Sequence, residues 1–234
     1  MAGNVARIKR INGVLLEVIL APKARVLNTL AGPLLNGMKY KFVVSGAAET
    51  GHCAKDAHIK AEELGREVVR QNGILITGAT TGMPFWSAKG AKEEGGISIG
   101  ISPAASYAAH VKSYRLPIDN FDFIIYTGFN YAGRNLLLTR SADAVIIVCG
   151  RMGTLNEFTI AFEDNKPIGI LIGTGGMADE IAHVVEKAHR GTGKIVYNSD
   201  PKKLVADLIQ IIDKDHKIVE GDSELDESFQ KDSE

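Results

Sequence analysis

The sequence is short of the features that define several large classes of protein. Only two cysteines, Cys53 and Cys149, occur among 234 residues, too few for a disulfide framework or a cysteine-rich metal cluster. No apolar run approaches the roughly 18 residues that a membrane span needs, and the longest, 13–21, is interrupted by Glu17. Lys and Arg number 27 against 28 Asp and Glu, so no excess of positive charge is available for a nucleic-acid backbone. We therefore expect a protein of the reducing cytoplasm that binds neither membranes nor nucleic acids.

What the sequence does contain is typical of one globular domain with distinctive ends. With 45% hydrophobic and 24% charged residues, the chain is long enough for one sizeable core and short for two. The acidic stretch 219–234 has little apolar content, so it is predicted to be a disordered tail. Residues 1–37 place an apolar run after Lys9 and Arg10 without a signal-peptide cleavage site. We expect an extension that packs on the domain or on an oligomer partner, and a folded body over 38–218.

Seven short runs rich in Val and Ile alternate with longer segments of helical spacing across this body. Such runs are typical of strands buried on both faces of a parallel sheet. They cover 41–44, 73–76, 97–101, 121–126, 144–148, 168–172 and 194–197. Apolar stripes recur at helical spacing over 57–69, 181–188 and 204–212, and Asp200 before Pro201 is a typical helix start. The pattern predicts a single α/β domain with a doubly wound, mainly parallel Rossmann-like sheet flanked by helices.

Glycine-rich turns follow four of the expected strands, at the end of the sheet where ligands bind in this architecture. The turns begin at Ser45, Thr77, Cys149 and Gly173. Their small residues leave backbone N–H groups accessible at helix N-termini, which suits a phosphorylated ligand. Each turn taken alone is equally well explained by the geometry of a sharp strand-to-helix connection.

The common nucleotide and metal motifs do not fit. Residues 173–178 have the G-x-G-x-x-A spacing of dinucleotide binders but follow the sixth expected strand instead of the first. Residues 191–194 are followed by Ile195, so the hydroxyl that a P-loop needs for Mg²⁺ is missing. The six histidines show no metal-ligand spacing. We therefore predict no metal and no resident cofactor.

The segment 133–157, GRNLLLTRSADAVIIVCGRMGTLNE, is more specific. It resembles the signature of the Lonely Guy family, the nucleoside 5′-monophosphate phosphoribohydrolases once grouped as lysine decarboxylase-like proteins. In that family P-G-G-x-G-T-x-x-E follows a strand, and a helix opening with Arg precedes it. The matching residues here are Gly150, Gly153, Thr154, Glu157 and, upstream, Arg134. An earlier turn resembles a second family motif through Gly78 and Gly82, and the resemblance covers about 38–212.

Three departures from the family pattern set this chain apart. Cys149 replaces the family's Pro, and Arg151 replaces its second Gly. Residues 84–86, Pro-Phe-Trp, add bulk where the family has a compact loop. The chain is therefore identified as a divergent member, similar to the Rossmann-like proteins that include a molybdenum-cofactor carrier. Fold transfers on such a resemblance more safely than substrate.

The resemblance implies a phosphate site and a catalytic pair. The expected phosphate or nucleotide-binding residues are Gly46, Gly78, Gly82, Gly150, Arg151, Gly153 and Thr154. Arg151 either adds a phosphate contact or points outward. Glu157 is expected to stabilise an oxocarbenium-like state or activate water, with Arg134 holding phosphate or orienting Glu157. The competing interpretations are a first-turn residue for Glu157 and a surface ion pair for Arg134.

Three functions remain open at this point. The first is hydrolysis of a purine nucleoside 5′-monophosphate to base and ribose 5-phosphate, favoured by Arg134 and Glu157. The second is a non-catalytic carrier of a nucleotide or of the pterin molybdenum cofactor, favoured by Cys149, Arg151 and the bulk at 84–86. The third is a regulatory protein with a vestigial pocket. The family's members are dimers or larger, so a homo-oligomer is also expected, with the leucines at 136–138 among its apolar material.

Overall fold

The computed structural model describes four stretches of the chain. They are 9–11, 14–16, 34–35 and 38–231. The chain divides into two units, 1–32 and 33–234. In the first unit, β1 (Lys9–Ile11) and β2 (Val14–Leu16) form an antiparallel hairpin. The predicted packing of the extension 1–37 falls mainly outside the described residues.

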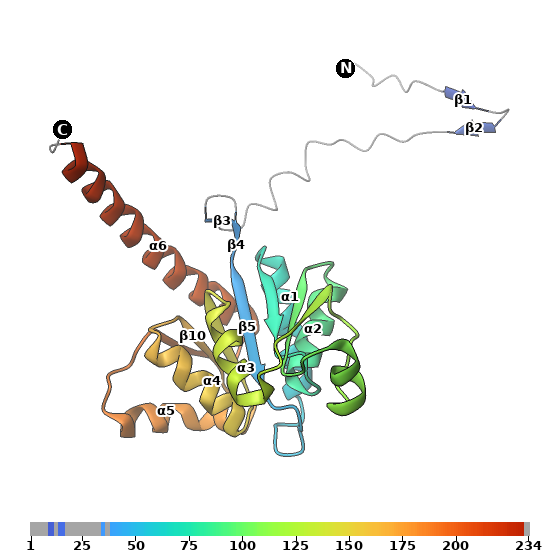
Figure 1. The fold of residues 1–234 in the computed structure, drawn as a ribbon, viewed down its shortest axis with the longest axis horizontal. Coiled ribbons are helices and arrows are strands. Elements are labelled where there is room, and N and C mark those ends of the chain that lie inside the picture. Colours follow the sequence, from blue (N-terminus) through green and yellow to red (C-terminus); the bar gives the residue numbers. More distant parts are fainter. Residues whose placement is uncertain (1–8, 12–13, 17–33, 36–37, 232–234) are drawn as a thin grey trace. The chain divides into compact units, whose positions relative to one another are not determined.

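A seven-stranded parallel sheet forms the centre of the second unit (Figure 1). Its strands are β5 (Lys41–Gly46), β6 (Ile74–Thr77), β7 (Ser98–Ser102), β8 (Phe123–Tyr126), β9 (Ala144–Val148), β10 (Ile168–Leu171) and β11 (Ile195–Asn198). Their order in space is β11-β10-β9-β5-β6-β7-β8, with every neighbouring pair parallel. All seven predicted strands are confirmed, with small shifts at their ends. Beside the sheet, β3 (Leu34–Leu35) pairs antiparallel with β4 (Met38–Lys39).

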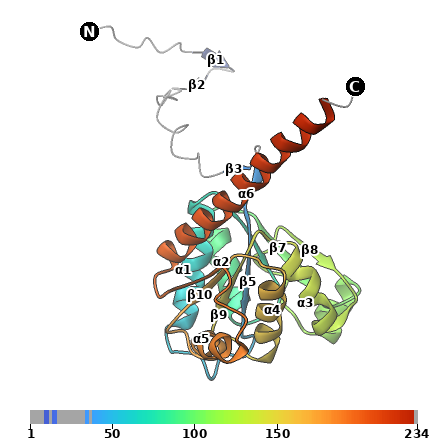
Figure 2. The ribbon, with the colours of Figure 1, turned by 90° about the vertical axis from the view of Figure 1, so that its left-hand side faces the viewer.

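Helices cover both faces of the sheet, so that its central strands are buried on two sides, whereas the edge strands β8 and β11 are partly exposed (Figure 2). One face carries α1 (Ala57–Arg70), α2 (Met83–Glu93) and α6 (Pro201–Lys231), whose apolar side chains form one core cluster. The other carries α3 (Asn130–Arg140), α4 (Met152–Glu163) and α5 (Met177–Ala188), with a second cluster. Every residue of β9 is buried, as its unbroken Ala-Val-Ile-Ile-Val run predicts. The Rossmann-like α/β fold is therefore confirmed.

The start of α6 is confirmed, whereas its length was not foreseen. Asp200 accepts hydrogen bonds from the N–H groups of Lys202 and Lys203, as an N-cap residue does. The helix then continues to Lys231, over most of the acidic stretch predicted to be disordered. That stretch contains no proline, so no residue in it forces the helix to end. None of the described helices is long and apolar enough to cross a membrane.

The direction of winding reverses between β5 and β9. After β5 the chain builds the sheet outward through β6, β7 and β8, and after β9 it builds in the opposite direction through β10 and β11. The two strands are nonetheless neighbours, with Gly46 paired to Val148 at their carboxyl ends. The loops that leave these ends diverge, which opens a crevice between them. In open α/β sheets this position is where ligands bind.

Candidate functional site

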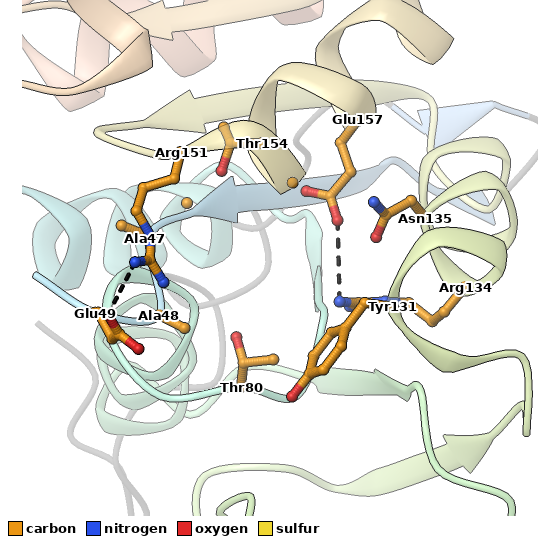
Figure 3. A pocket seen from close by; sticks show the side chains of 12 residues that line it. Ala47, Ala48, Glu49, Thr80, Tyr131, Arg134, Asn135, Arg151, Thr154 and Glu157 are labelled. Atoms are coloured by element: carbon orange, nitrogen blue, oxygen red, sulfur yellow. Dashed lines mark hydrogen bonds and ion pairs between the residues drawn. The ribbon is translucent and has the colours of Figure 1, made fainter. Parts of the chain in front are cut away.

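A pocket of about 380 Å³ lies at this crevice (Figure 3). Its walls come from the turn after β5, from Thr80 after β6, from α3, and from the first turns of α4. Six of the nine residues that the sequence singles out line it. They are Gly46, Arg134, Arg151, Gly153, Thr154 and Glu157. The volume falls within the range of pockets that enclose small organic ligands.

Glu157 lies at the floor of the pocket with its carboxylate surrounded by donors. The Ser45 hydroxyl donates a hydrogen bond to Oε2 of Glu157. The amide nitrogen of Asn135, in the orientation that satisfies its neighbours, lies 2.8 Å from Oε1 and also donates to the carbonyl of Tyr131. Glu157 is only 6% exposed. It is therefore a buried site residue, and the interpretation as a first-turn capping residue is wrong.

The charge partner of Glu157 is Arg134. Nη2 of Arg134 lies 4.0 Å from Oε1 of Glu157, as the dashed line in Figure 3 marks. Arg134 is buried as well, so the surface ion pair considered from the sequence is excluded. Burial raises the pKa of the Glu157 carboxyl, an effect that Arg134 and the Ser45 hydroxyl oppose. A carboxyl with a raised pKa in a ligand pocket is typical of groups that transfer protons in catalysis.

The guanidinium of Arg134 packs against the ends of the neighbouring strands β6 and β7. Its Nη1 donates to the carbonyl of Ile101, 3.2 Å away. A Cβ at Gly78 would lie 1.9 Å from the same Nη1, so only glycine leaves room for the guanidinium. The role of Gly78 is thus to accommodate Arg134, since it does not line the main pocket. Arg134 lies one turn inside α3, which begins at Asn130, and not at the helix start that the resemblance implies.

The N-terminus of α4 opens onto the pocket. The helix begins at Met152, has no side-chain cap, and carries no acidic residue in its first turn. Leu155 is the first residue whose N–H reaches a carbonyl of the helix start, that of Arg151. The N–H groups of Gly153 and Thr154 therefore precede the helical hydrogen-bond ladder, and both residues line the pocket. Such a helix start attracts anions.

Arg151 spans the mouth of this pocket. Its Nη1 lies 2.8 Å from a carboxylate oxygen of Glu49, in the turn after β5 (Figure 3). Both side chains are well exposed, so this ion pair is weak and open to exchange. The sequence left open whether Arg151 reaches toward the ligand or away from it. The structure places the guanidinium at the pocket rim, where it is paired with the Glu49 carboxylate.

Gly82 and Gly150 support the site without lining it. A Cβ at Gly82 would lie 2.0 Å from the carbonyl of Ala47, where the turn after β5 meets the start of α2. Gly150 lies beneath Thr154, and its carbonyl accepts from the N–H of Met177. The bulky residues Phe85 and Trp86 belong to the first turn of α2, and their rings meet edge to face outside the pocket wall. Neither residue lines the pocket.

The cysteines correct one expectation. Cys53 and Cys149 form a disulfide across a sequence separation of 96 residues. Cys53 lies in the loop after β5 and Cys149 directly follows β9, so the two meet where these neighbouring strands end. The sequence interpretation dismissed the pair because it counted cysteines without knowing the strand order. The cysteine count therefore gives no ground for placing the protein in a reducing compartment.

Sequence reasoning also missed several residues that line the pocket or contact Glu157. Ser45 immediately precedes Gly46 at the end of β5, the strand-end position where ligand-binding residues gather. Asn135 follows Arg134 directly, and Tyr131 lies one helical turn before it on the same side of α3. Their positions in the sequence, at the end of a strand and one helical turn apart on a helix, were signals of a possible role in the site. They could be used only once the strand order showed which ends meet.

Comparison with known proteins places this fold and site in a family. The model of the SLOG cluster4 family matches residues 39–205, most of the chain. The chain belongs to the SLOG cluster4 family. An uncharacterized protein of Archaeoglobus fulgidus is 31% identical over 131 residues, which are 56% of this SLOG cluster4 chain and 81% of the archaeal protein.

Two solved structures extend the comparison. The X-ray structure of TM1055 is 25% identical, with a TM-score of 0.61 over 76% of this chain and 99% of that one. The Moco carrier protein of Chlamydomonas reinhardtii is 26% identical, with a TM-score of 0.61 over 75% of this chain and 99% of that one. These likenesses confirm the sequence-based identification of a divergent Lonely Guy-like branch near the molybdenum-cofactor carriers.

Proposed function

We propose that this SLOG cluster4 protein binds a nucleoside 5′-monophosphate and hydrolyses its N-glycosidic bond to free base and ribose 5-phosphate. The observation that supports the proposal most strongly is the buried carboxylate of Glu157 beside an uncapped helix N-terminus. Thr154 and Glu157 are three residues apart on α4, about 4.5 Å along the helix axis. A phosphate held at Thr154 would direct the ribose of the ligand toward Glu157.

The chemistry of the bond fits a buried carboxylate. Cleavage of an N-glycosidic bond passes through a state with positive charge on the sugar ring, which a carboxylate stabilises. The raised pKa of Glu157 lies nearer to neutral pH than that of an ordinary glutamate. A group exchanges protons with water or with the leaving base most effectively when its pKa is close to the working pH. Arg134 keeps the carboxylate in place and balances its charge. In this scheme Glu157 is the catalytic residue and Arg134 orients it.

The same contacts also support a second function, the binding of a ligand without reaction. Both carboxylate oxygens of Glu157 already accept a hydrogen bond, from Ser45 and from Asn135. Arg151 is likewise paired with Glu49 at the rim. A pocket whose polar groups are satisfied in this way can bind a ligand without reacting with it. The likeness to a Moco carrier protein supports a pterin cofactor or a nucleotide as such a ligand.

A panel of nucleoside 5′-monophosphates separates the two functions. Hydrolysis predicts release of free base by the wild-type chain and a loss of at least about 10²-fold in turnover for Glu157→Gln, the scale of a lost acid–base group. The matched control is Glu163→Gln, on the same helix but exposed and paired with Arg190. The control should keep wild-type turnover. Tight binding without any release of base by the wild-type chain would support the carrier function and refute hydrolysis.

A further inference from the structure

The loops behind the pocket bring a third potential metal ligand, the imidazole of His52, close to the two cysteines. His52 precedes Cys53 in the loop after β5, and its Nε2 lies 3.6 Å from Sγ of Cys149. The ligand atoms of His52, Cys53 and Cys149 all lie within 4.8 Å of one another. Among the described residues this is the one cluster of His, Cys, Asp and Glu side chains close enough to hold a metal ion.

We propose that reduction of the Cys53–Cys149 disulfide creates a binding site for a thiophilic divalent cation of the zinc class, with His52 as the third ligand. Two thiolates and one imidazole are a donor set that zinc takes in proteins, with the fourth position left for water or another ligand. Zinc–sulfur bonds of about 2.3 Å and zinc–nitrogen bonds of about 2.0 Å place the S and N atoms of a tetrahedral site about 3.5 Å apart. The Sγ–Nε2 separation of 3.6 Å between Cys149 and His52 agrees with that geometry.

The backbone holds both cysteines in place independently of the sulfur–sulfur bond. Cys149 donates its N–H to the Thr174 hydroxyl at 2.8 Å and accepts from the N–H of Ala178 at 2.8 Å. Cys53 forms a β-bridge with Gly175, and the N–H of its neighbour Ala54 reaches the carbonyl of Thr174 at 3.0 Å. After reduction the two thiols therefore remain beside each other. A site prepared in this way loses little conformational entropy when the metal binds.

Access and close packing also fit a metal at this place. Cys149 is fully buried, Cys53 is half-buried and His52 is exposed, so an ion can enter from the His52 side. A Cβ at Gly176 would lie 2.9 Å from Sγ of Cys149, so the backbone encloses the sulfur closely. The Nε2 of His52 lies 3.2 Å from the carbonyl of Gly150, a contact that the imidazole exchanges for the metal. The bonded metal thus connects the loop after β5 to the loop that opens α4.

The redox step needs a dithiol as reductant. The dithiol supplies two electrons and two protons, its own sulfurs close to a disulfide, and Cys53 and Cys149 become thiols. Binding of the divalent cation then releases both thiol protons to solvent, because thiolate is the ligand form. The disulfide and the metal complex exclude each other, since both use the same two sulfurs. The oxidation state of the pair therefore decides whether the cation binds.

Cobalt(II) titration of the full chain tests the proposal. After treatment with dithiothreitol and its removal under anaerobic conditions, we expect one Co²⁺ per chain, thiolate charge-transfer absorption, and the d–d bands of a tetrahedral ion. The oxidised chain should show none of these, and Zn²⁺ should displace the Co²⁺ signal. Release of two protons per metal, followed with a pH indicator, supports two thiolate ligands.

Variants identify the ligands. Cys53→Ser should abolish the charge-transfer signal, and His52→Asn should weaken Co²⁺ binding by at least about tenfold, since even outer partners of metal ligands cost 10–100-fold. His58→Asn is the matched control, because His58 packs on Trp86 and lies outside the cluster. Near-ultraviolet circular dichroism checks that each variant is folded. If Cys53→Ser does not fold, His52→Asn still tests the site, because it keeps both thiols.

Either of two results overturns the proposal. One is a reduced wild-type chain that binds Co²⁺ no more tightly than His52→Asn or without thiolate absorption. The other is a folded chain that yields no titratable thiols after excess dithiol, because the disulfide would then be purely structural.

Discussion

Oε1 of Glu157 and Nη2 of Arg134 lie 4.0 Å apart, with side chains only 8% and 5% exposed, at the floor of the pocket. Burying two opposite charges costs solvation that their attraction only partly returns. Such a pair is weak evidence for stability, and it lies at the reversal of strand order, the position where ligands bind in open α/β sheets. Removing one member leaves the other charge buried without compensation, so changes here affect stability as well as function.

The raised pKa of Glu157 predicts how stability depends on pH. A carboxyl whose pKa is higher in the folded than in the unfolded chain contributes its full stability below the unfolded value. That contribution is lost as pH rises through the folded value. The free energy of unfolding of the wild-type chain, minus that of Glu157→Gln, should therefore fall as pH rises above the ordinary glutamate pKa of 4.5. Each unit of elevation corresponds to about 1.4 kcal/mol.

Urea unfolding of both proteins across this pH range measures that difference. Glutamine keeps the size of the side chain and does not titrate, so other groups cancel in the subtraction. A difference that grows with pH would show that Arg134 and Ser45 outweigh burial and hold the Glu157 pKa low.

Gly78 offers a test of how Arg134 is positioned. An alanine at 78 would bring its Cβ to 1.9 Å from Nη1 of Arg134, which must move or strain its surroundings. We expect Gly78→Ala to destabilise the fold by about 1–3 kcal/mol, the usual cost of overpacking. Gly51→Ala is the control, because a Cβ there meets nothing within 4 Å. Thermal or urea unfolding should leave Gly51→Ala close to the wild-type chain, and equal losses in both variants would contradict this role.

Much of the fold followed from the sequence, and the exceptions at the site have one cause. Runs such as Ala144–Val148 specify buried parallel strands by composition alone, and the Asp200 cap fixes the start of α6. The Cys53–Cys149 bond and the role of Gly78 toward Arg134 depend on which loops meet in space. Strand order is a long-range property that no local pattern contains. The family resemblance located Glu157, because a family motif identifies residues that meet in the folded site, whereas composition does not.

Assembly is a further prediction. The edge strand β8 and the helix α3 that follows it expose apolar side chains, among them Phe123, Ile125 and Leu137. Exposed apolar surface marks protein–protein contacts where it is contiguous. Leu138, from the same leucine run, is instead part of the core. We expect a homodimer or larger assembly, and Leu137→Glu should shift it toward monomer.

Light scattering at micromolar concentration measures that shift. Ile59→Glu is the control, because Ile59 is also exposed but lies on α1, on the other face of the sheet. A monodisperse wild-type monomer would contradict the prediction.

The phosphate site at the start of α4 is required by both proposed functions. We expect a nucleotide phosphate to bind the N–H groups of Gly153 and Thr154 and the Thr154 hydroxyl, with Arg151 exchanging Glu49 for the ligand. Thr154→Val keeps the shape of the side chain and removes the hydroxyl donor. A lost hydrogen bond to a charged partner costs about 1.5–3 kcal/mol, so affinity for a nucleoside monophosphate should fall at least about tenfold.

Calorimetry with paired ligands isolates the phosphate from the rest of the nucleotide. The corresponding nucleoside lacks the phosphate, so it should bind the wild-type chain weakly and should not distinguish Thr154→Val from it. Thr159→Val, on the outer side of α4 and outside the pocket lining, is the matched control and should bind the monophosphate as the wild-type chain does. Equal affinities for nucleoside and nucleotide, unchanged in Thr154→Val, would mean that the helix start holds no phosphate. The placement of the ribose over Glu157 would then have to be abandoned, because it depends on a phosphate anchored one turn earlier on the same helix.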